Sequence, residues 1–554
     1  MAMDRRRFLK QATVAGATAF ALPGLAACSR TAVGGHFAPA GVLRPPAARQ
    51  GGRLTVGPMG DGGNYDPTTN VFDYPQMPLS SIFEGLTAYP AGGSSWSARN
   101  LLARSIEKSP DGRTHRFVLR EGVQFHHGFG EMTAADVKYS FERAAGLVPL
   151  YPGAPKDSVS YYAGDFSGLT GVTVTGRYSG EIHFKTPFVP FEAITLPFAT
   201  SGYITSRKAI RTYGADAGQH PVGTGPYEVV SYTPNSHMTL RRFAAYRGHN
   251  EALGAHNAFD EIQIVLTPDN ARSNGQALTV PIESGEVDFT DTLGALDVQL
   301  LAGDPRFTAY RPRMALDYFF LAIDVKHPDL RDIRVRQAIR SAVDIEEINL
   351  ANRVPSSNRQ KAAVSSGLDV GHWPGAPAYG RDVAKAKRLL AEAGVRDLSL
   401  TIATPNLSIT SGDPNAVMQV IQSNLKDAGI DVEIVTTAPE SFVTEPGKAG
   451  LLWANFAGAP DPYYQLEWFT CAQIGVWNFA FWCEPRYGRL LDRLGTTTQR
   501  HRRQAIAVEM QRLMDASAAY VFMSEALNFG LSKSGIQAVF DGNGNAQLHY
   551  FYRV

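Results

Sequence analysis

The stretch from His220 to Gly248 constrains the fold of this chain more than any other part of the sequence. It begins with a glycine-punctuated turn, PVGTGP, and continues with two runs of β-branched and aromatic residues, Tyr227–Tyr232 and Met238–Phe243. The Thr-Pro-Asn-Ser sequence between the two runs has the chemistry of a turn. The pattern therefore predicts a loop followed by a β-hairpin.

The length of the chain, 554 residues, indicates about three or four domains. Its hydrophobic content of 44% is ordinary for a globular protein, and its formal net charge is +1. Since no long run of like charge occurs, the chain lacks the electrostatic surface that nucleic-acid binding requires. We therefore expect no nucleic-acid partner.

The first fifty residues carry export signals. An arginine run, Arg5–Arg7, precedes an apolar segment, Ala12–Leu25, that is too short to span a bilayer. The segment ends in Leu-Ala-Ala-Cys28, and a lipid on this cysteine would tether the protein without crossing the membrane. We predict a twin-arginine signal peptide with a lipobox over residues 1–27, a flexible tether over residues 28–50, and export to the periplasm or the cell surface. An ordinary cleaved signal with a chance cysteine is the alternative.

Residues 121–142 read EGVQFHHGFGEMTAADVKYSFE and combine a turn with the start of a helix at Thr133. The neighbouring His126 and His127 suggest a metal site as one interpretation. No third ligand lies at a useful spacing, so we interpret the histidines as structural and expect neither a metal nor another cofactor.

A strand–helix–strand pattern occupies residues 398–436. The two strands, Leu398–Ala403 and Val432–Thr436, flank a helix predicted between Asp413 as its N-cap and Gly429 just after its end. Parallel strands need such a crossover, so this is a βαβ unit in a parallel or mixed sheet.

Several of these motifs, in this order from residue 51 to about residue 520, resemble the family 5 extracytoplasmic solute-binding proteins, the peptide and nickel receptors of ABC importers. PVGTGPY matches a segment of that family. The sequence around His126 resembles the pattern L-R-x-G-V-x-F-H-D-G followed by T-A-x-D-V-x-Y-S-F, with His126 at the place of a structural histidine. Arg331–Ala338 resembles the family's D-x-R-V-R-Q-A step.

The resemblance implies an α/β fold: a two-lobed periplasmic-binding-protein clamshell, type II-like, with an extra domain inserted in lobe one. We expect lobe one to comprise residues 51–88, 220–312 and 521–554, the inserted domain residues 89–219, and lobe two residues 313–520. A small solute would lie between the lobes and be delivered to the membrane subunits of an ABC permease. We expect a monomer that is lipid-anchored to the membrane.

The chain has three cysteines. If Cys28 carries lipid, Cys471 and Cys483 remain in an oxidising compartment, which favours a disulfide between them. The dipeptide-binding branch of the family has a disulfide-closed loop at the same place. Two unpaired buried thiols are the alternative.

The charged groups with which dipeptide receptors hold their ligands are missing from the matching positions. The aspartate for the ligand ammonium falls at Gly458, or at Phe456 if the segment is counted from Trp453. The Arg-Pro-Tyr for the ligand carboxylate falls at residues 410–412, which are Thr, Ser and Gly. Replacement by nearby charged side chains is the alternative: Asp461, Arg359 or Lys361.

We therefore predict an aromatic pocket with a few polar groups, in which a peptide or a less charged solute binds. Packing in the protein core is the alternative for each of its members. The candidate ligand-binding residues are Tyr65, Trp453, Asn455, Phe456, Asp461, Trp477, Asn478 and Phe479.

Two other functions remain open at this point. One is a receptor of the same fold for a non-peptide solute, such as a metal chelate, haem, an oligosaccharide, or a lipid-like or opine-like compound. The other is an exported hydrolase. The motifs GxSxG, HExxH, Walker A and CxxC are absent from the sequence, which favours a binding protein over an enzyme.

Overall fold

The structure of the protein is a computed structural model. It describes residues 37–38, 49–70, 76–92, 96–156, 158, 160, 162–268, 279–404, 414–436 and 438–554. The predicted signal peptide, Cys28, most of the predicted tether and residues 410–412 lie outside this part of the chain. Within it, no helix has the length and apolar character that crossing a membrane requires.

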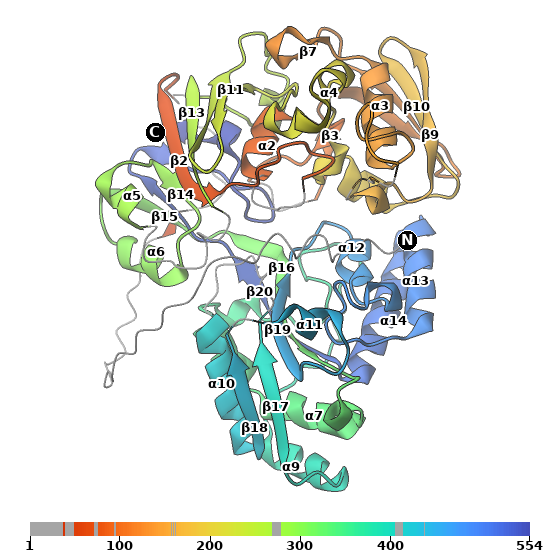
Figure 1. Ribbon diagram of the computed structural model, residues 1–554, viewed down its shortest axis with the longest axis vertical. Helices are drawn as coiled ribbons and strands as arrows, with labels where there is room; N and C mark the ends of the chain where they lie inside the picture. Colours follow the sequence, from red (N-terminus) through yellow and green to blue (C-terminus); the bar gives the residue numbers. More distant parts are fainter. Residues whose placement is uncertain are drawn as a thin grey trace.

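The upper lobe in Figure 1 is built on an eight-stranded mixed sheet. Its strands, in spatial order, are β1 (Phe37–Ala38), β15 (Phe307–Tyr310), β21 (Gly530–Lys533), β14 (Phe289–Thr290), β2 (Arg53–Gly60), β13 (Glu261–Thr267), β12 (His237–Arg242) and β11 (Tyr227–Thr233). The predicted hairpin is confirmed: β11 and β12 pair antiparallel from Tyr227 opposite Arg242 to Thr233 opposite His237.

The turn before this hairpin packs on helix α2 (Gln76–Ile82). A Cβ atom on Gly223 would lie 2.0 Å from the carbonyl oxygen of Ile82, so only glycine fits there. Two hydrogen bonds of the His126 imidazole stabilise the same turn. Its Nε2 donates to the Gly225 carbonyl over 2.9 Å, and its Nδ1 accepts from the Gly223 N–H over 3.3 Å. Both ring nitrogens are therefore used inside the protein, which is the structural role predicted for this histidine.

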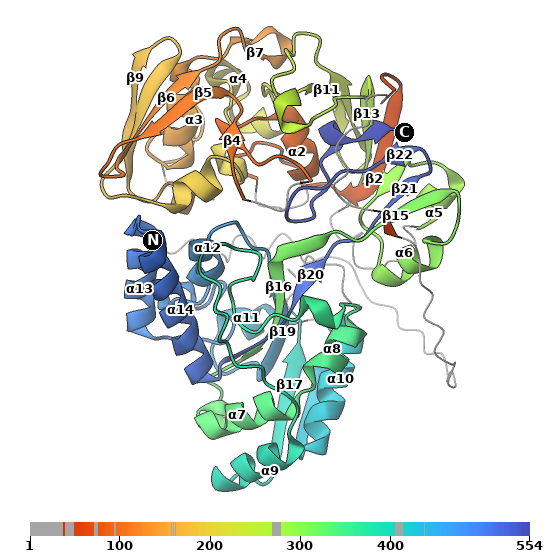
Figure 2. The same cartoon turned by 180° about the vertical axis from the view of Figure 1, so that it is seen from behind.

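Between β2 and β11 in sequence, the chain forms a second sheet beside the first. Its four strands are, in spatial order, β5 (Ala103–Lys108), β6 (Thr114–Leu119), β10 (Ser179–Phe184) and β9 (Leu169–Gly176). Helix α3 (Ala134–Ala144) covers this sheet, and a capping box of Thr133 and Asp136 begins the helix. Figure 2 shows this part from behind, at the outer end of the upper lobe.

The lower lobe has a five-stranded sheet with helices on both faces. Its strands, in spatial order, are β18 (Ile430–Val435), β17 (Leu398–Ala403), β19 (Leu451–Phe456), β16 (Arg313–Ile323) and β20 (Tyr520–Leu527). The helices on one face are α7 (Ile333–Ala342), α8 (Ile345–Ala351), α9 (Val383–Glu392) and α10 (Pro414–Asp427). Those on the other are α11 (Glu440–Thr444), α12 (Pro462–Glu467), α13 (Pro485–Thr496) and α14 (Arg500–Ser517). The predicted βαβ unit is confirmed, because β17 and β18 pair in parallel and α10 connects them.

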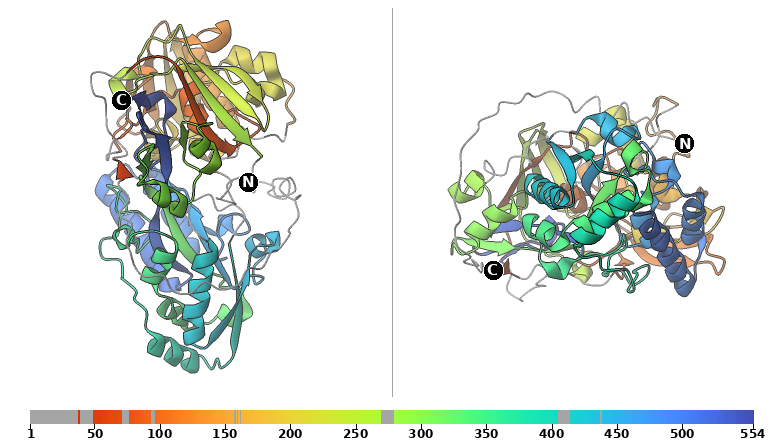
Figure 3. Two further views of the ribbon diagram at one scale, coloured as in Figure 1. Left: turned by 90° about the vertical axis from the view of Figure 1, so that its left-hand side faces the viewer. Right: turned by 90° about the horizontal axis from the view of Figure 1, so that it is seen from below.

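Two neighbouring strands, β16 and β20, carry the chain between the lobes (Figure 1), and Figure 3 shows the two lobes from the side. They pair antiparallel from Arg313 opposite Leu527 to Ala322 opposite Tyr520. The predicted boundary at residue 521 assigned β20 to lobe one. This pairing places the whole strand in the sheet of lobe two, so the return to lobe one comes after Leu527.

Candidate functional site

The upper lobe rests on helices α12 and α13 of the lower lobe. The Val189 N–H donates to the Gly495 carbonyl over 2.8 Å, and the rings of Phe188 and Tyr463 meet edge to face with centroids 5.6 Å apart. Trp96 of the upper lobe packs against the apolar cluster of the lower lobe. Residues of both lobes therefore form one shared face.

Four aromatic side chains form what we call the aromatic surface of lobe two: the partly exposed Trp468 and Trp477, and the buried Phe456 and Phe479 that pack against them. Phe456 lies at the centre of the set, with its ring centroid 5.4 Å from that of Phe479, 6.1 Å from Trp468 and 6.4 Å from Trp477. Both tryptophans remain partly exposed. Three predicted site residues thus lie together, in the apolar cluster against which Trp96 packs.

The sequence analysis missed Trp468. This residue follows the last turn of α12, and its ring meets that of Tyr464, four residues earlier, edge to face at 4.9 Å. A spacing of four puts two residues on the same face of a helix. The aromatic i, i+4 pair just after the Asp461-Pro462 helix start is the signal that points to it.

Asn478 shapes the loop that carries Trp477 and Phe479. Its side chain is fully buried, and its Nδ2 lies 3.2, 3.0 and 2.7 Å from the carbonyl oxygens of Phe469, Thr470 and Trp482. Its Oδ1 accepts from the Tyr520 hydroxyl over 2.7 Å. The hydrogen-bonding capacity of the amide is therefore used within the protein, and Asn478 does not lie in the site as the polar handle that was predicted.

The same loop is bounded by Cys471 and Cys483. Their sulfur atoms lie at bonding distance, 2.15 Å, with the Cα atoms 4.6 Å apart. The two cysteines and the Asn478 amide thus lie where the two ends of the loop come next to each other.

Trp453 lies on the opposite side of the lower sheet. It is 1% exposed and stacks on Phe319 with ring centroids 4.9 Å apart and an interplanar angle of 10°. Side chains alternate along a strand, so Trp453 and Asn455 point to one side of the sheet and Phe456 points to the other. Trp453 is a core residue of lobe two, contrary to its predicted place in the pocket.

Two further candidates, Asp461 and Tyr65, make hydrogen bonds to residues of their own lobes. The carboxylate of Asp461 receives both terminal nitrogens of the buried Arg503, at 2.8 and 2.7 Å, and also caps α12 by accepting from the Tyr463 N–H. Tyr65 is fully buried in lobe one, and its hydroxyl donates to Asp61 over 3.0 Å. Asp461 therefore does not supply the missing negative anchor.

The structure leaves no space for an aspartate side chain at Gly458, one of the two positions that match the ammonium anchor of dipeptide receptors. A Cβ atom on Gly458 would lie 2.2 Å from the carbonyl oxygen of Leu316 in β16. The Gly458 N–H donates to Asp317 over 3.1 Å, and the side-chain amide of Asn543 donates to the same carboxylate oxygen over 2.8 Å. This network joins the loop after β19 to the strand between the lobes, and it leaves no space for a side chain.

Two carboxyl groups lie where the lobes meet, that of Glu467 in the lower lobe and that of Asp165 in the upper lobe. Burial raises the pKa of Glu467 in α12 well above its usual value, and the carboxylate of Asp165 in the upper lobe adds to this shift. Burial also raises the pKa of Asp165, to about 6, although the hydroxyl of Ser201 donates to it over 2.6 Å. This part of the contact is acidic.

A cavity of about 90 Å³ lies in the upper lobe behind Trp96. Its walls come from the end of α2, the stretch after it, the segment 197–203 and the C-terminal segment 541–550. Its lining residues are Ser80, Phe83, Glu84, Gly85, Ala88, Tyr89, Ala91, Trp96, Leu101, Pro197, Phe198, Tyr203, Pro226, Asn250, Leu253, Asp541, Gln547, His549 and Tyr550. Trp96 belongs to this wall and also touches lobe two, so the cavity borders the face between the lobes.

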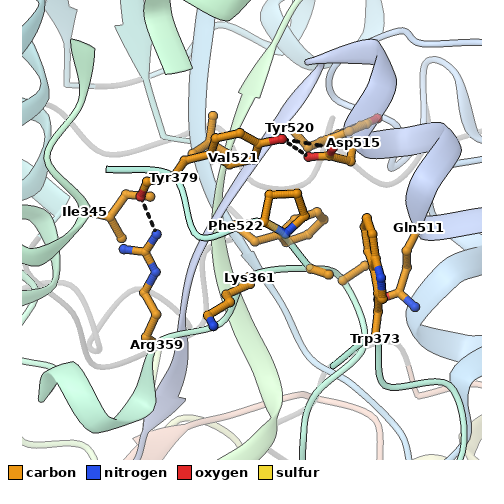
Figure 4. A pocket seen from close by; sticks show the side chains of 13 residues that line it. Ile345, Arg359, Lys361, Trp373, Tyr379, Gln511, Asp515, Tyr520, Val521 and Phe522 are labelled. Atoms are coloured by element: carbon orange, nitrogen blue, oxygen red, sulfur yellow. Dashed lines mark hydrogen bonds between the residues drawn. The ribbon is translucent and has the colours of Figure 1, made fainter. Parts of the chain in front are cut away.

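A smaller hollow lies along the β20 edge of lobe two (Figure 4). In it the Tyr379 hydroxyl donates to both carboxylate oxygens of Asp515, and Arg359 donates to the Tyr379 carbonyl over 2.9 Å. Its volume of about 20 Å³ is space for roughly one water molecule. Arg359 and Lys361 line this hollow, which is too small for a solute.

Two α/β lobes joined by paired crossing strands, with aromatic side chains and a cavity at their shared face, define a binding protein that closes around a small molecule. The chain belongs to the bacterial extracellular solute-binding proteins, family 5, whose family model matches residues 98–475. Proteins of this family are the extracytoplasmic solute receptors of ABC importers and not enzymes.

Two curated relatives illustrate the similarity. The di/tripeptide-binding protein 2 of Pseudomonas aeruginosa (strain UCBPP-PA14) is 26% identical over 490 residues, which are 84% of this chain and 87% of the relative. The dipeptide-binding protein of Escherichia coli (strain K12) is 23% identical over 447 residues, 77% of this chain and 81% of the relative.

Solved structures share the fold. The periplasmic binding protein DppA from Helicobacter pylori, in complex with the peptide STSA, superposes with a TM-score of 0.74 at 21% identity, over 91% of this chain and 98% of that one. MoaA from A. tumefaciens R10, in complex with mannopinic acid, gives a TM-score of 0.73 at 22% identity, over 91% and 100%. The expected clamshell fold is thus confirmed.

Proposed function

We propose that this protein captures a peptide or peptide-like solute between its lobes and delivers it to the membrane subunits of an ABC permease. The observation that carries the proposal is the aromatic surface of lobe two, with Trp96 of the upper lobe packed against the same cluster. Aromatic faces bind the apolar parts of a solute, and hinge closure at β16 and β20 would remove it from water. We expect the receptor to act as a monomer.

The absence of a side chain at Gly458 separates this site from that of a receptor that holds the ammonium of a dipeptide. A buried ammonium without a partner costs several kcal/mol, so the site favours a longer peptide held by its backbone, or a less charged solute. The second candidate function is therefore a receptor for a non-peptide solute. The fold similarity to a protein solved with mannopinic acid supports this alternative.

Native mass spectrometry of the exported protein, purified without unfolding, tests the proposal by the mass of the solute that it retains. Calorimetry with panels of di-, tri- and tetrapeptides then ranks the ligands. A retained peptide, or micromolar binding of one peptide class, supports the peptide function. A retained non-peptide solute would favour the second candidate, and peptide hydrolysis by the purified protein would contradict both.

We also propose that the protein is a lipoprotein exported by the twin-arginine route and anchored at Cys28. The support is the order of Arg5–Arg7, apolar segment and cysteine in the sequence. Changing Cys28 to Ser is expected to move the protein from the membrane to the soluble fraction, because a lipid chain would be its only tether. Fractionation with a carbonate wash measures this, and a Cys28→Ser protein that stays on the membrane would contradict the anchor.

A disulfide between Cys471 and Cys483 is the third part of the proposal, supported by the oxidising compartment expected for an exported protein and by Cα atoms 4.6 Å apart. Thiol labelling of the denatured, unreduced protein is expected to find neither cysteine free. Because a short closed loop restricts the unfolded chain, reduction should lower the free energy of unfolding by about 3 kcal/mol. Labelling of both cysteines without a reductant would show that the loop is open.

A further inference from the structure

The cavity behind Trp96 contains a buried imidazole whose hydrogen bonds are not completed by the protein. His549 is 8% exposed and lines the cavity. Its Nδ1 lies 3.4 Å from the hydroxyl oxygen of Ser81, a contact in which either group could donate. In the described part of the chain, no hydrogen bond joins the other nitrogen, Nε2, to the protein. Burial lowers the pKa of His549 to about 3, so the ring is neutral at physiological pH.

The two carboxylates in the cavity wall, those of Glu84 and Asp541, in contrast already accept hydrogen bonds from the protein. Glu84 accepts from the hydroxyls of Thr224 and Tyr246, at 3.0 and 2.8 Å, and lies 2.9 Å from Nε2 of His249. Asp541 accepts from the N–H groups of Asn543 and Asn545 at 2.8 and 2.9 Å. Neither carboxylate needs a cation from a ligand.

The same carboxylates make the cavity unfavourable for an anion. No lysine or arginine is among its lining residues. A carboxylate that entered would leave water, gain no counter-charge and lie near two groups of its own sign. A neutral amide or hydroxyl would leave water at a smaller cost and could pair with an imidazole nitrogen that is otherwise unpaired.

The volume limits the group that fits. About 90 Å³ is smaller than the roughly 150 Å³ cavity that holds a benzene molecule, so a short side chain fits and an aromatic ring does not. Tyr89, Trp96 and Phe198 form the aromatic wall, and Tyr89 and Trp96 rings meet edge to face at 5.3 Å. Burial raises the pKa of Tyr89, and the nearby carboxylate of Asp461 in lobe two adds to the shift, which again places this wall at the face between the lobes.

We propose that this cavity is a specificity subsite of the solute-binding site: it takes a short, uncharged hydrogen-bonding group of the bound solute, an amide or a hydroxyl, with Nε2 of His549 as its partner. The inference rests on the proposed function. An amide or hydroxyl can donate or accept, so it matches Nε2 whichever nitrogen of the ring carries the proton. His549 then selects among solutes that the aromatic surface alone would accept.

The test compares two tripeptides of equal shape, Ala-Asn-Ala and Ala-Asp-Ala, by calorimetry. The wild-type protein is expected to bind the amide peptide at least tenfold more tightly than the acid. In His549→Phe, which keeps a ring but has no nitrogen, the preference should fall below about threefold. The matched control is His220→Phe, since His220 is exposed and does not line the cavity, and it should keep the wild-type preference.

Two further measurements keep the result decisive. Ala88→Leu, which fills the cavity from a different wall, should abolish the same preference even if His549→Phe does not fold. In ¹⁵N NMR of the wild-type protein, propionamide but not propionate should shift the Nε2 resonance of His549. If neither tripeptide binds but propionamide gives this shift, the peptide function fails and the subsite stands. An unchanged preference in both variants, or no shift with propionamide, would overturn the subsite.

Discussion

Replacing Arg503 by methionine is expected to lower the free energy of unfolding by about 3–5 kcal/mol, because it leaves the buried carboxylate of Asp461 without its counter-charge. Arg503 and Asp461 have side chains that are 7% and 4% exposed, and two hydrogen bonds join them. Denaturant unfolding followed by tryptophan fluorescence measures the change, since the aromatic surface lies on the same lobe.

The matched control is Arg486→Met, which breaks the exposed ion pair of Arg486 and Glu509 between α13 and α14. Exposed pairs contribute at most about 1 kcal/mol, so this variant should remain close to the wild type. The double variant Arg503→Met with Asp461→Asn should regain part of the loss, because no unpaired charge is then buried. Equal, small effects of Arg503→Met and Arg486→Met would show that Asp461 has another partner.

This ion pair also explains an error of the sequence analysis. Asp461 precedes a proline and a helix, a pattern that correctly predicts an N-cap, and a local pattern contains nothing more. Its partner lies 42 residues later in the chain, in α14. A free carboxylate in a binding loop and a carboxylate paired across the core have the same local sequence, so only the fold distinguishes them.

The parts of the fold that local patterns determine were predictable. The β11–β12 hairpin follows from turn chemistry between two β-branched runs, and the β17–α10–β18 unit from helix caps between two strands. The family motifs placed these units in the right order. The clamshell was implied by that resemblance and not by composition or periodicity.

The faces of the buried strands were not predictable. Every residue of β19, Leu451–Phe456, is buried, because helices cover both sides of the sheet. Such a strand shows no alternation of polar and apolar residues, so nothing in its sequence says that Phe456 lies toward the shared face and Trp453 away from it. Strand β20 is buried in the same way, so its sequence does not show whether it belongs to the sheet of lobe one or to that of lobe two.

Introducing the missing aspartate, as Gly458→Asp, is expected to destabilise the protein by about 3 kcal/mol or more and to create no dipeptide site. The new Cβ would lie 2.2 Å from the Leu316 carbonyl, and this carbonyl belongs to the strand that joins the lobes, so it cannot move alone. The new carboxylate would also be buried near Asp317, to which the Gly458 N–H already donates.

The ligand affinities follow from the same geometry. Simple dipeptides should bind the wild-type protein more weakly than about 100 μM, or less favourably than about −5.5 kcal/mol, because their ammonium finds no carboxylate at this position. Gly458→Asp should not improve on this, since its side chain must distort the loop that carries it. Calorimetry with a dipeptide panel and denaturant unfolding measure the two effects.

The control is Gly380→Asp, because a Cβ on Gly380 would meet no atom within 4 Å and should change the free energy of unfolding by about 0.5 kcal/mol at most. Comparing the two variants separates the effect of an added charge from the effect of the close contact with Leu316. A Gly458→Asp protein that folds as stably as Gly380→Asp and binds a dipeptide with submicromolar affinity would show that the loop after β19 can open. In that case the network of Asp317, Asn543 and the Gly458 N–H would not be what excludes an aspartate side chain at position 458.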